Sequence, residues 1–217
     1  MQQASSIRNE SVIEVPFLSD EECNTIRDFF HWKEEELIRD GYGDHKENEV
    51  FKNILTSNYF RYNFFHYFPD LADRLAEMLN ATMHPNNLEW PLAVQAWCNV
   101  YRTGDGIDWH NHQGIMGQSF TANIFIDGPT APGLYYKPFN EKATVLENKK
   151  GYIQILPCEL YHKVPPNESE DARYTIGLTI HSYPIIGKTL IDRYAFNSKT
   201  YQDTIILTRE HMINEDT

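Results

Sequence analysis

The stretch that decides the fold is "WCNVYRTGDGIDWHNHQG", Trp97 to Gly114. An alternating segment that ends near Tyr101 is followed by "TGDG", a bend that needs glycine. His110 and His112 then stand two residues apart on the next extended piece, so their side chains point to the same side and can reach one ion. Two ordinary surface or core histidines would give the same pattern, so a metal site here depends on a second cluster elsewhere.

Such a cluster follows in "LYHKVPPNESEDARYTI", which contains His162 and, eleven residues later, Arg173. His162 comes at the end of a predicted strand, and Arg173 opens the next one. Residues at these two positions can flank one cavity from neighbouring strands. Trp109 is expected to face away from the metal by alternation, and His181, at the end of the Arg173 strand, is expected to be structural or to line the cavity.

Length and composition limit the class of protein. A chain of 217 residues predicts a single domain, 1–217. The net charge of -12 disfavours a nucleic-acid partner, because phosphate backbones are bound mainly through basic side chains. Three cysteines, an odd number without a CxxC pair, fit a reducing cytoplasm. The first residues contain no apolar run typical of a signal peptide, and no segment approaches the ~20 apolar residues of a membrane helix.

Helices are predicted early in the chain. "VIEVPF", 12–17, reads as a short strand, and Ser19 with Glu22 forms a capping box that starts a helix over 20–37. "RDGYGDHKENEV" has the composition of a loop. Pro69 starts a second helix in "PDLADRLAEMLNATM". Residues 1–87 are therefore expected to form an N-terminal strand and helices.

Strand signals dominate after Pro85. The segments are short, β-branched and aromatic, and Gly, Pro, Asn and Asp separate them: "LAVQAWCNVYR", "SFTANIFIDG", "GLYYKPF", "GYIQILPCELYHKV" and "ARYTIGLTIHSY". The order predicts an α+β, mainly β fold, in which helices pack outside a β-sandwich or jelly roll. The core is expected over 88–182. A C-terminal extension, 183–217, would add a strand or two, or a covering flap.

Together the two histidine clusters resemble the Fe(II)/2-oxoglutarate-dependent oxygenases. In that family a Tyr-x-x-Gly precedes His-x-Asp, and a distal His is followed by an Arg or Lys. This chain has "YRTG" at Tyr101, "HNH" at His110, then His162 and Arg173. The strand segments look like the prolyl-hydroxylase branch, and "NVY" matches the Asn-x-Tyr of nucleic-acid demethylases. The HxH is most similar to a poorly characterised group of bacterial and phage proteins.

The resemblance, which covers about 88–182, implies a double-stranded β-helix core, Fe(II) and 2-oxoglutarate as cosubstrate. It implies hydroxylation of a substrate with release of succinate and CO2. The expected catalytic residues are His110, His162 and Arg173, the metal ligands His110, His112 and His162, and the cosubstrate-binding residues Arg173, Tyr101 and Asn99. A planar guanidinium can bind the far carboxylate of 2-oxoglutarate through two hydrogen bonds.

The second histidine of HxH departs from the family pattern. His112 is the third ligand in one interpretation. In a second it stands beside the metal, and water or an anion fills the position. In a third, a carboxylate elsewhere, such as Asp105 or Asp108, completes the set. Three imidazoles also suit zinc, and Arg173 with the 2-oxoglutarate pattern favours iron.

Three functions remain open. The first is a 2-oxoglutarate-dependent hydroxylase of a peptide, a prolyl residue or a small molecule. The second is a cupin-like three-His dioxygenase that does not use 2-oxoglutarate. The third is a non-catalytic jelly-roll binding module. Base demethylation is a weaker variant of the first, because the acidic charge counts against it.

Overall fold

The computed structural model describes residues 12–42, 53–83, 90–112, 119–138, 142–182 and 205–207. Within these ranges the chain forms ten strands: β1 (Ile13–Pro16), β2 (Leu92–Tyr101), β3 (Ile107–His110), β4 (Ser119–Asp127), β5 (Leu134–Lys137), β6 (Thr144–Leu146), β7 (Tyr152–Pro157), β8 (Tyr161–Val164), β9 (Arg173–Ser182) and β10 (Ile205–Leu207).

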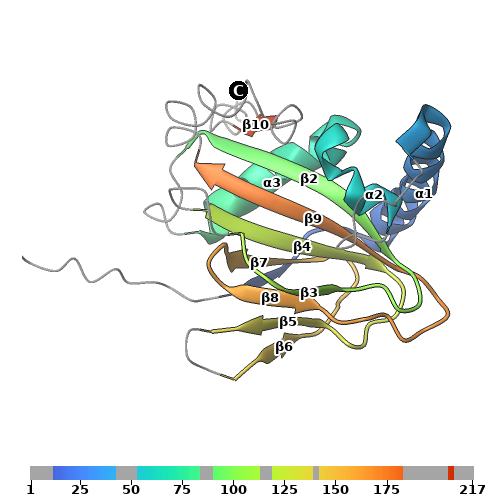
Figure 1. The fold of residues 1–217 in the computed structure, drawn as a ribbon. Coiled ribbons are helices and arrows are strands. Elements are labelled where there is room, and N and C mark those ends of the chain that lie inside the picture. Colours follow the sequence, from blue (N-terminus) through green and yellow to red (C-terminus); the bar gives the residue numbers. More distant parts are fainter. Residues whose placement is uncertain are drawn as a thin grey trace, which may run out of the picture.

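The strands build two sheets that face each other (Figure 1). The larger sheet has six strands in the order β1-β7-β4-β9-β2-β10, and the smaller has four in the order β3-β8-β5-β6. All pairings between these strands are antiparallel. Apart from β5 and β6, which follow each other along the chain, neighbours in each sheet are far apart in sequence, as in a jelly roll. The expected mainly β architecture with a double-stranded β-helix core is confirmed.

Helices cover the side of the large sheet away from the small sheet (Figure 1). They are α1 (Asp20–Leu37), α2 (Ile54–Ser57) and α3 (Pro69–Thr82), joined by a π-helical turn η1 (Ile38–Tyr42) and the 3-10 turns η2 (Tyr59–Arg61) and η3 (Phe64–His66). None of the described helices is both long enough and apolar enough to cross a membrane.

Strand β2 contributes one face to the apolar core and the other face to a cavity. Alternate residues on its outer face, such as Val94 and Cys98, join the apolar core with Ile26 of α1 and Leu75 of α3. Residues between them, such as Trp97, face the small sheet and line a cavity. Burial on both faces leaves β2 with almost no exposed residue. The helices therefore pack on one face of β2 and form the main apolar core with it. The other face of β2 lines the cavity.

The predicted helices are confirmed with small differences. The capping box at Ser19 is present: the Ser19 hydroxyl accepts from the Glu22 amide at 3.2 Å, and the Glu22 carboxylate accepts from the Ser19 amide at 2.8 Å. This reciprocal pair fixes the start of α1. The loop expected after α1 begins instead with η1, where Gly41 has a φ of 87°; residues 43–52 lie outside the described residues.

One predicted segment contains two strands. "GYIQILPCELYHKV" splits into β7 and β8, separated by a turn in which the Leu160 amide donates to the Pro157 carbonyl at 3.1 Å. The turn carries the chain from the large sheet to the small one and brings His162 to the inner side. Of the C-terminal extension, β10 is described, and it pairs with the edge of β2.

Candidate metal centre

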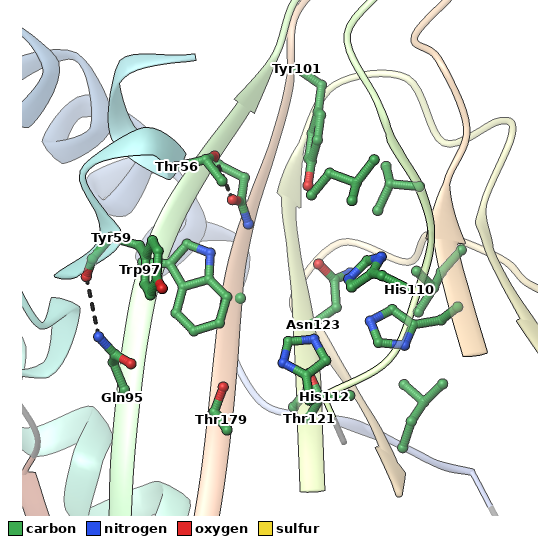
Figure 2. Close-up of a pocket in the computed structure, with 18 of the residues that line it drawn as sticks. Thr56, Tyr59, Gln95, Trp97, Tyr101, His110, His112, Thr121, Asn123 and Thr179 are labelled. Atoms are coloured by element: carbon green, nitrogen blue, oxygen red, sulfur yellow. Dashed lines mark hydrogen bonds between the residues drawn. The ribbon is translucent and has the colours of Figure 1, made fainter. Parts of the chain in front are cut away.

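Three histidines meet at the small sheet and line the space between the two sheets, and Figure 2 labels two of them, His110 and His112. His110 ends β3 and pairs with His162 of β8, and His112 follows two residues later. One ring nitrogen from each residue lies within 4.8 Å of the others. The ring centres are 4.2 Å apart for His110 and His162, and 5.2 Å apart for His112 and His162. The structure thus brings together all three residues expected to bind metal.

Backbone carbonyls set the orientation of two of the imidazoles. Nδ1 of His110 lies 2.8 Å from the Asp108 carbonyl oxygen, and Nδ1 of His162 lies 3.0 Å from that of Leu160. Because a carbonyl oxygen only accepts, each Nδ1 carries the hydrogen and each Nε2 keeps its lone pair. His112 is held through its backbone amide, which donates to the Cys158 carbonyl at 3.0 Å.

Burial keeps these imidazoles neutral. Burial, with a smaller contribution from the nearby His110, lowers the pKa of His112 to about 4 and that of His162 to about 3. Burial also lowers the pKa of His110 itself. Neutral imidazole is the form that binds a metal ion. Three nitrogen donors, two of them with lone pairs set by backbone carbonyls, fit a divalent iron or zinc ion.

The carboxylates considered as alternative ligands point elsewhere. The Asp105 carboxylate accepts from the Arg102 amide at 3.0 Å, and the Asp108 carboxylate accepts from the Trp109 amide at 2.7 Å. Among the residues that the structure describes, the group that can hold a metal contains the three histidines and no acidic side chain. Within that part of the chain, this favours His112 over Asp105 and Asp108 for the third position.

A cavity of about 370 Å³ lies between the two sheets, in front of the histidines. Below it runs the β2–β9 ladder, with five successive cross-strand pairs: Tyr101–Arg173, Asn99–Thr175, Trp97–Gly177, Gln95–Thr179 and Ala93–His181. The residues of these pairs line the cavity except Arg173 and Thr175, which line a small adjoining pocket. We name the first two pairs the arginine end and the last two the amide end. The Trp97–Gly177 pair divides them.

Arg173 is almost completely buried, at 1% exposure. Its Nη1 donates to the Pro132 carbonyl at 3.1 Å and its Nη2 to the Pro165 carbonyl at 2.8 Å. The guanidinium was expected to present a free fork, and the structure differs because each terminal nitrogen already uses one hydrogen on the backbone. Each keeps a second hydrogen. Nε has no hydrogen-bond partner among the described residues.

A small polar pocket of about 10 Å³ adjoins the main cavity at the arginine end. Arg173, Asn123, Asn148 and Thr175 contribute its polar lining, and Asn123 also lines the main cavity. Burial lowers the pKa of Arg173, and Tyr101 is the one titratable neighbour among the described residues that affects it. Among the described residues the Arg173 charge therefore has no carboxylate partner, and it lies buried beside this small pocket.

Tyr101 and Asn99 line the cavity as expected, but Asn99 is already engaged. The Thr56 hydroxyl of α2 donates to the Asn99 Oδ1 at 2.7 Å, and the Asn99 Nδ2 donates to the Thr175 hydroxyl at 3.3 Å. Burial raises the pKa of Tyr101, so its phenol stays protonated and able to donate. A side-chain hydrogen bond with Thr175 partly offsets the rise in this pKa, so Tyr101 and Asn99 both contact Thr175.

Several residues that line the cavity were not predicted from the sequence, and the role of His181 had two interpretations. Asn123 and Thr121 of β4 line the cavity, and alternation along that strand would have found them. Thr56 and Tyr59 reach it from the helical segment before β2, where no sequence signal indicated them. His181 lines the cavity.

Trp109 faces away as predicted, with its indole near the ammonium groups of Lys137 and Lys163, at 4.7 and 5.2 Å.

Neither a protein-family model nor a curated protein matches the sequence. Solved structures do match its fold. EvdMO1 is 16% identical with a TM-score of 0.58; the match covers 80% of this chain and 47% of EvdMO1, so this chain spans about half of that protein's length. A prolyl hydroxylase from Trichoplax adhaerens, in complex with a hypoxia inducible factor peptide fragment, is 13% identical with a TM-score of 0.57, over 83% of this chain and 88% of that one.

A third neighbour is the viral collagen prolyl hydroxylase of Paramecium bursaria Chlorella virus-1, solved as a 2-oxoglutarate complex. It is 14% identical with a TM-score of 0.52, over 80% of this chain and 97% of that chain. At these identities the likeness concerns the fold. The chain therefore has the double-stranded β-helix fold of the 2-oxoglutarate–Fe(II) oxygenases, with a three-histidine group on the small sheet.

Proposed function

We propose that the chain is an Fe(II)- and 2-oxoglutarate-dependent dioxygenase that hydroxylates a peptide, a prolyl residue or a small molecule. The observation that carries this proposal is Arg173, a buried cation without a carboxylate partner among the described residues, beside a cavity that contains three neutral imidazoles. The two features match the two ends of a cosubstrate that chelates a metal at one end and carries a free carboxylate at the other.

Burying a guanidinium without an opposite charge is costly, and an anion bound next to it would offset that cost. The Nε of Arg173 and the second hydrogens of its terminal nitrogens remain available as donors. The Tyr101 phenol adds a neutral donor on the cavity side. Arg173 and Tyr101 would therefore hold the far carboxylate, and Asn99 would orient the neighbouring Thr175 hydroxyl.

His110 and His162 would hold the metal through Nε2, with His112 as the third ligand. Bound Fe(II) with 2-oxoglutarate would supply the oxidation of a substrate C–H bond by O2, with 2-oxoglutarate converted to succinate and CO2. Three neutral ligands leave the full double positive charge of the ion uncompensated. They would therefore favour an anionic cosubstrate more than a set with one carboxylate does.

The direct test is an anaerobic titration of the iron-loaded chain with 2-oxoglutarate, followed by visible absorption. A charge-transfer band is expected with 2-oxoglutarate and not with succinate, which lacks the keto group. Arg173→Leu should abolish the band at the same 2-oxoglutarate concentration. Arg102→Leu is the matched control, because Arg102 follows Tyr101 but pairs with Glu34 on the surface at 2.7 Å.

Each competing function gives its own result in this titration. A three-His dioxygenase independent of 2-oxoglutarate would bind about one iron per chain and show no band, with Arg173→Leu behaving as the parent. A non-catalytic jelly roll would retain far less than one metal ion per chain after reconstitution. Either result would overturn the proposal.

A further inference from the structure

The amide end of the cavity takes no part in the proposed binding of metal or cosubstrate. It begins at Trp97, whose indole projects from β2 toward the space in front of the histidines (Figure 2). The indole lies directly against the backbone of Gly177 on β9: a Cβ added there would be 2.8 Å from Cε2 and 2.9 Å from Cζ2 of the ring. Because Gly177 has no side chain, the indole can pack directly on the backbone of β9, and its ring lines the cavity.

Tyr59 holds this indole from the other side. The two ring centres are 5.5 Å apart and the rings are inclined by 56°. The Gln95 Nε2 donates to the Tyr59 carbonyl at 3.4 Å, which ties the same 3-10 turn to the amide end. Both side chains line the cavity. Trp97 is thus supported below by Gly177 and laterally by Tyr59, as a fixed aromatic platform.

Neutral polar groups follow beyond the platform. Thr121 of β4 lies opposite Thr179 of β9, which in turn lies opposite Gln95 of β2. The Thr121 hydroxyl donates to the Leu178 carbonyl at 3.1 Å, so its oxygen still has capacity to accept. His181 of β9 also lines this end of the cavity. The amide end therefore offers hydroxyl, carboxamide and imidazole groups.

The cavity lining also excludes a class of ligand. Among the described residues that line the main cavity, none is Asp, Glu, Lys or Arg. A carboxylate or ammonium group placed at the amide end would lose its hydration without gaining an opposite charge. Aromatic faces instead favour flat apolar groups, and hydroxyl and amide groups pair with neutral polar edges.

We propose that Trp97 and the amide end form the substrate site, and that it takes an uncharged ring whose face lies on the indole and whose polar edge meets Gln95, Thr121 or Thr179. This inference rests on the proposed function, because it gives the substrate the part of the cavity that the cosubstrate does not need. Trp97 is in this view a specificity-determining residue and Gly177 a positioning residue that acts through it.

The test uses three flat probes of nearly equal shape and different charge: benzamide is neutral, benzoate is anionic and benzamidine is cationic. Binding to the full chain loaded with Zn(II) and saturated with 2-oxoglutarate is measured by ligand-observed NMR titration. Benzamide should bind at least about tenfold more tightly than either charged probe. Absence of benzamide binding, or equal binding of the three probes, would overturn the proposal.

Variants of Gly177 and Trp97 show whether the probe binds on the indole. Gly177→Ala should push the indole into the cavity and Trp97→Leu should remove the platform, each weakening benzamide binding by about fivefold or more. Trp109→Leu is the control, because that indole lies near Lys137 and Lys163 on the outer side. Circular dichroism melting verifies that each variant is folded. Benzamide affinity that is unchanged in a folded Trp97→Leu variant would exclude the platform.

Failure of the proposed function is distinguishable from failure of this inference. The benzamide titration is repeated with the Zn(II)-loaded chain without 2-oxoglutarate, where the platform alone should preserve the preference for benzamide over benzamidine. If the 2-oxoglutarate charge-transfer band is absent and the preference for benzamide persists, the proposed cosubstrate is wrong and the neutral ring site stands. If the band is present and benzamide is not preferred, the ring site is wrong and the proposed cosubstrate stands.

Discussion

Arg173 lies directly opposite Tyr101 across the β2–β9 ladder, and its guanidinium carbon is 5.0 Å from the centre of the Tyr101 ring. Both side chains are buried, at 1% and 2% exposure. An aromatic face and two backbone carbonyls thus hold this cation, whereas Arg74 pairs with the carboxylate of Glu22. This relationship marks the arginine end of the cavity as a place for an anion.

Tyr101→Phe should weaken 2-oxoglutarate binding by about five- to tenfold, because it removes one neutral donor beside the carboxylate. Metal affinity should not change, since the ring stays in place. The anaerobic titration of the iron-loaded chain measures the change. Tyr174→Phe is the control, because Tyr174 lies on the other face of β9, where its hydroxyl is 3.4 Å from His31 Nε2. Equal affinities for Tyr101→Phe and the parent chain would exclude a role for the phenol.

His112→Ala should lower metal affinity by at least about a hundredfold, since it removes a ligand rather than a supporting group. His112→Asp should retain the metal but bind 2-oxoglutarate more weakly, because an added negative ligand reduces the charge that attracts an anion. Elemental analysis after dialysis against a chelator gives the metal content.

The control for both histidine variants is His66→Ala, at an exposed position in η3. Should His112→Ala keep the parent's metal affinity, His112 stands beside the metal rather than on it. The position would then belong to water or an anion, which was the second interpretation of the sequence.

Thr56→Val should destabilise the fold by about 1–2 kcal/mol, because the buried Asn99 Oδ1 would lose its donor at nearly constant side-chain volume. Thr56→Ser keeps the hydroxyl and should cost less. Urea unfolding of the metal-free chain gives the free energies. A Thr56→Val variant as stable as the parent would mean that the link between α2 and β2 contributes nothing to stability.

Glu22→Gln should remove a pH-dependent part of the stability. The hydrogen bonds from Arg74 lower the pKa of Glu22 to about 2 from its ordinary 4.5. A carboxyl with a lowered folded pKa stabilises the native state above pH 4.5, and this contribution is lost as the pH falls toward 2. Both side chains are partly exposed, at 31% and 41%, so about 1 kcal/mol is expected above pH 5.

Urea unfolding of the parent and Glu22→Gln chains across pH 2.5–6 checks this prediction, and the two curves should converge at the acid end. Glu21→Gln, an exposed neighbour on the same helical turn, should follow the parent throughout. A constant gap between parent and Glu22→Gln at all pH values would assign the effect to capping geometry instead of charge.

Several features of the fold were readable from the sequence because their causes are local. The capping box at Ser19 set the start of α1, and Pro69 set the start of α3, since both act within one helical turn. Alternation along β2 separated Trp97 and Asn99 from their core-facing neighbours, because successive side chains of a strand point to opposite faces.

The meeting of His110, His112 and His162 was predicted from motif spacing and resemblance, and the structure brings them together. Other parts of the site could not be read in this way. Thr56 and Tyr59 enter the cavity from a segment with no periodic signal, and the hydrogen bond from Thr56 to Asn99 joins residues 43 positions apart. The split of one apolar run into β7 and β8 likewise depends on which sheet each half joins.

By itself the sequence determined where α1 and α3 begin, that strands dominate after Pro85, and which side chains have the chemistry of a metal site. Only the tertiary structure decided that Arg173 is tied to the carbonyls of Pro132 and Pro165, and that Trp97 rests on Gly177. The reason is physical: propensity and periodicity act over a few residues, whereas these contacts join separate strands and loops whose distances are set by packing.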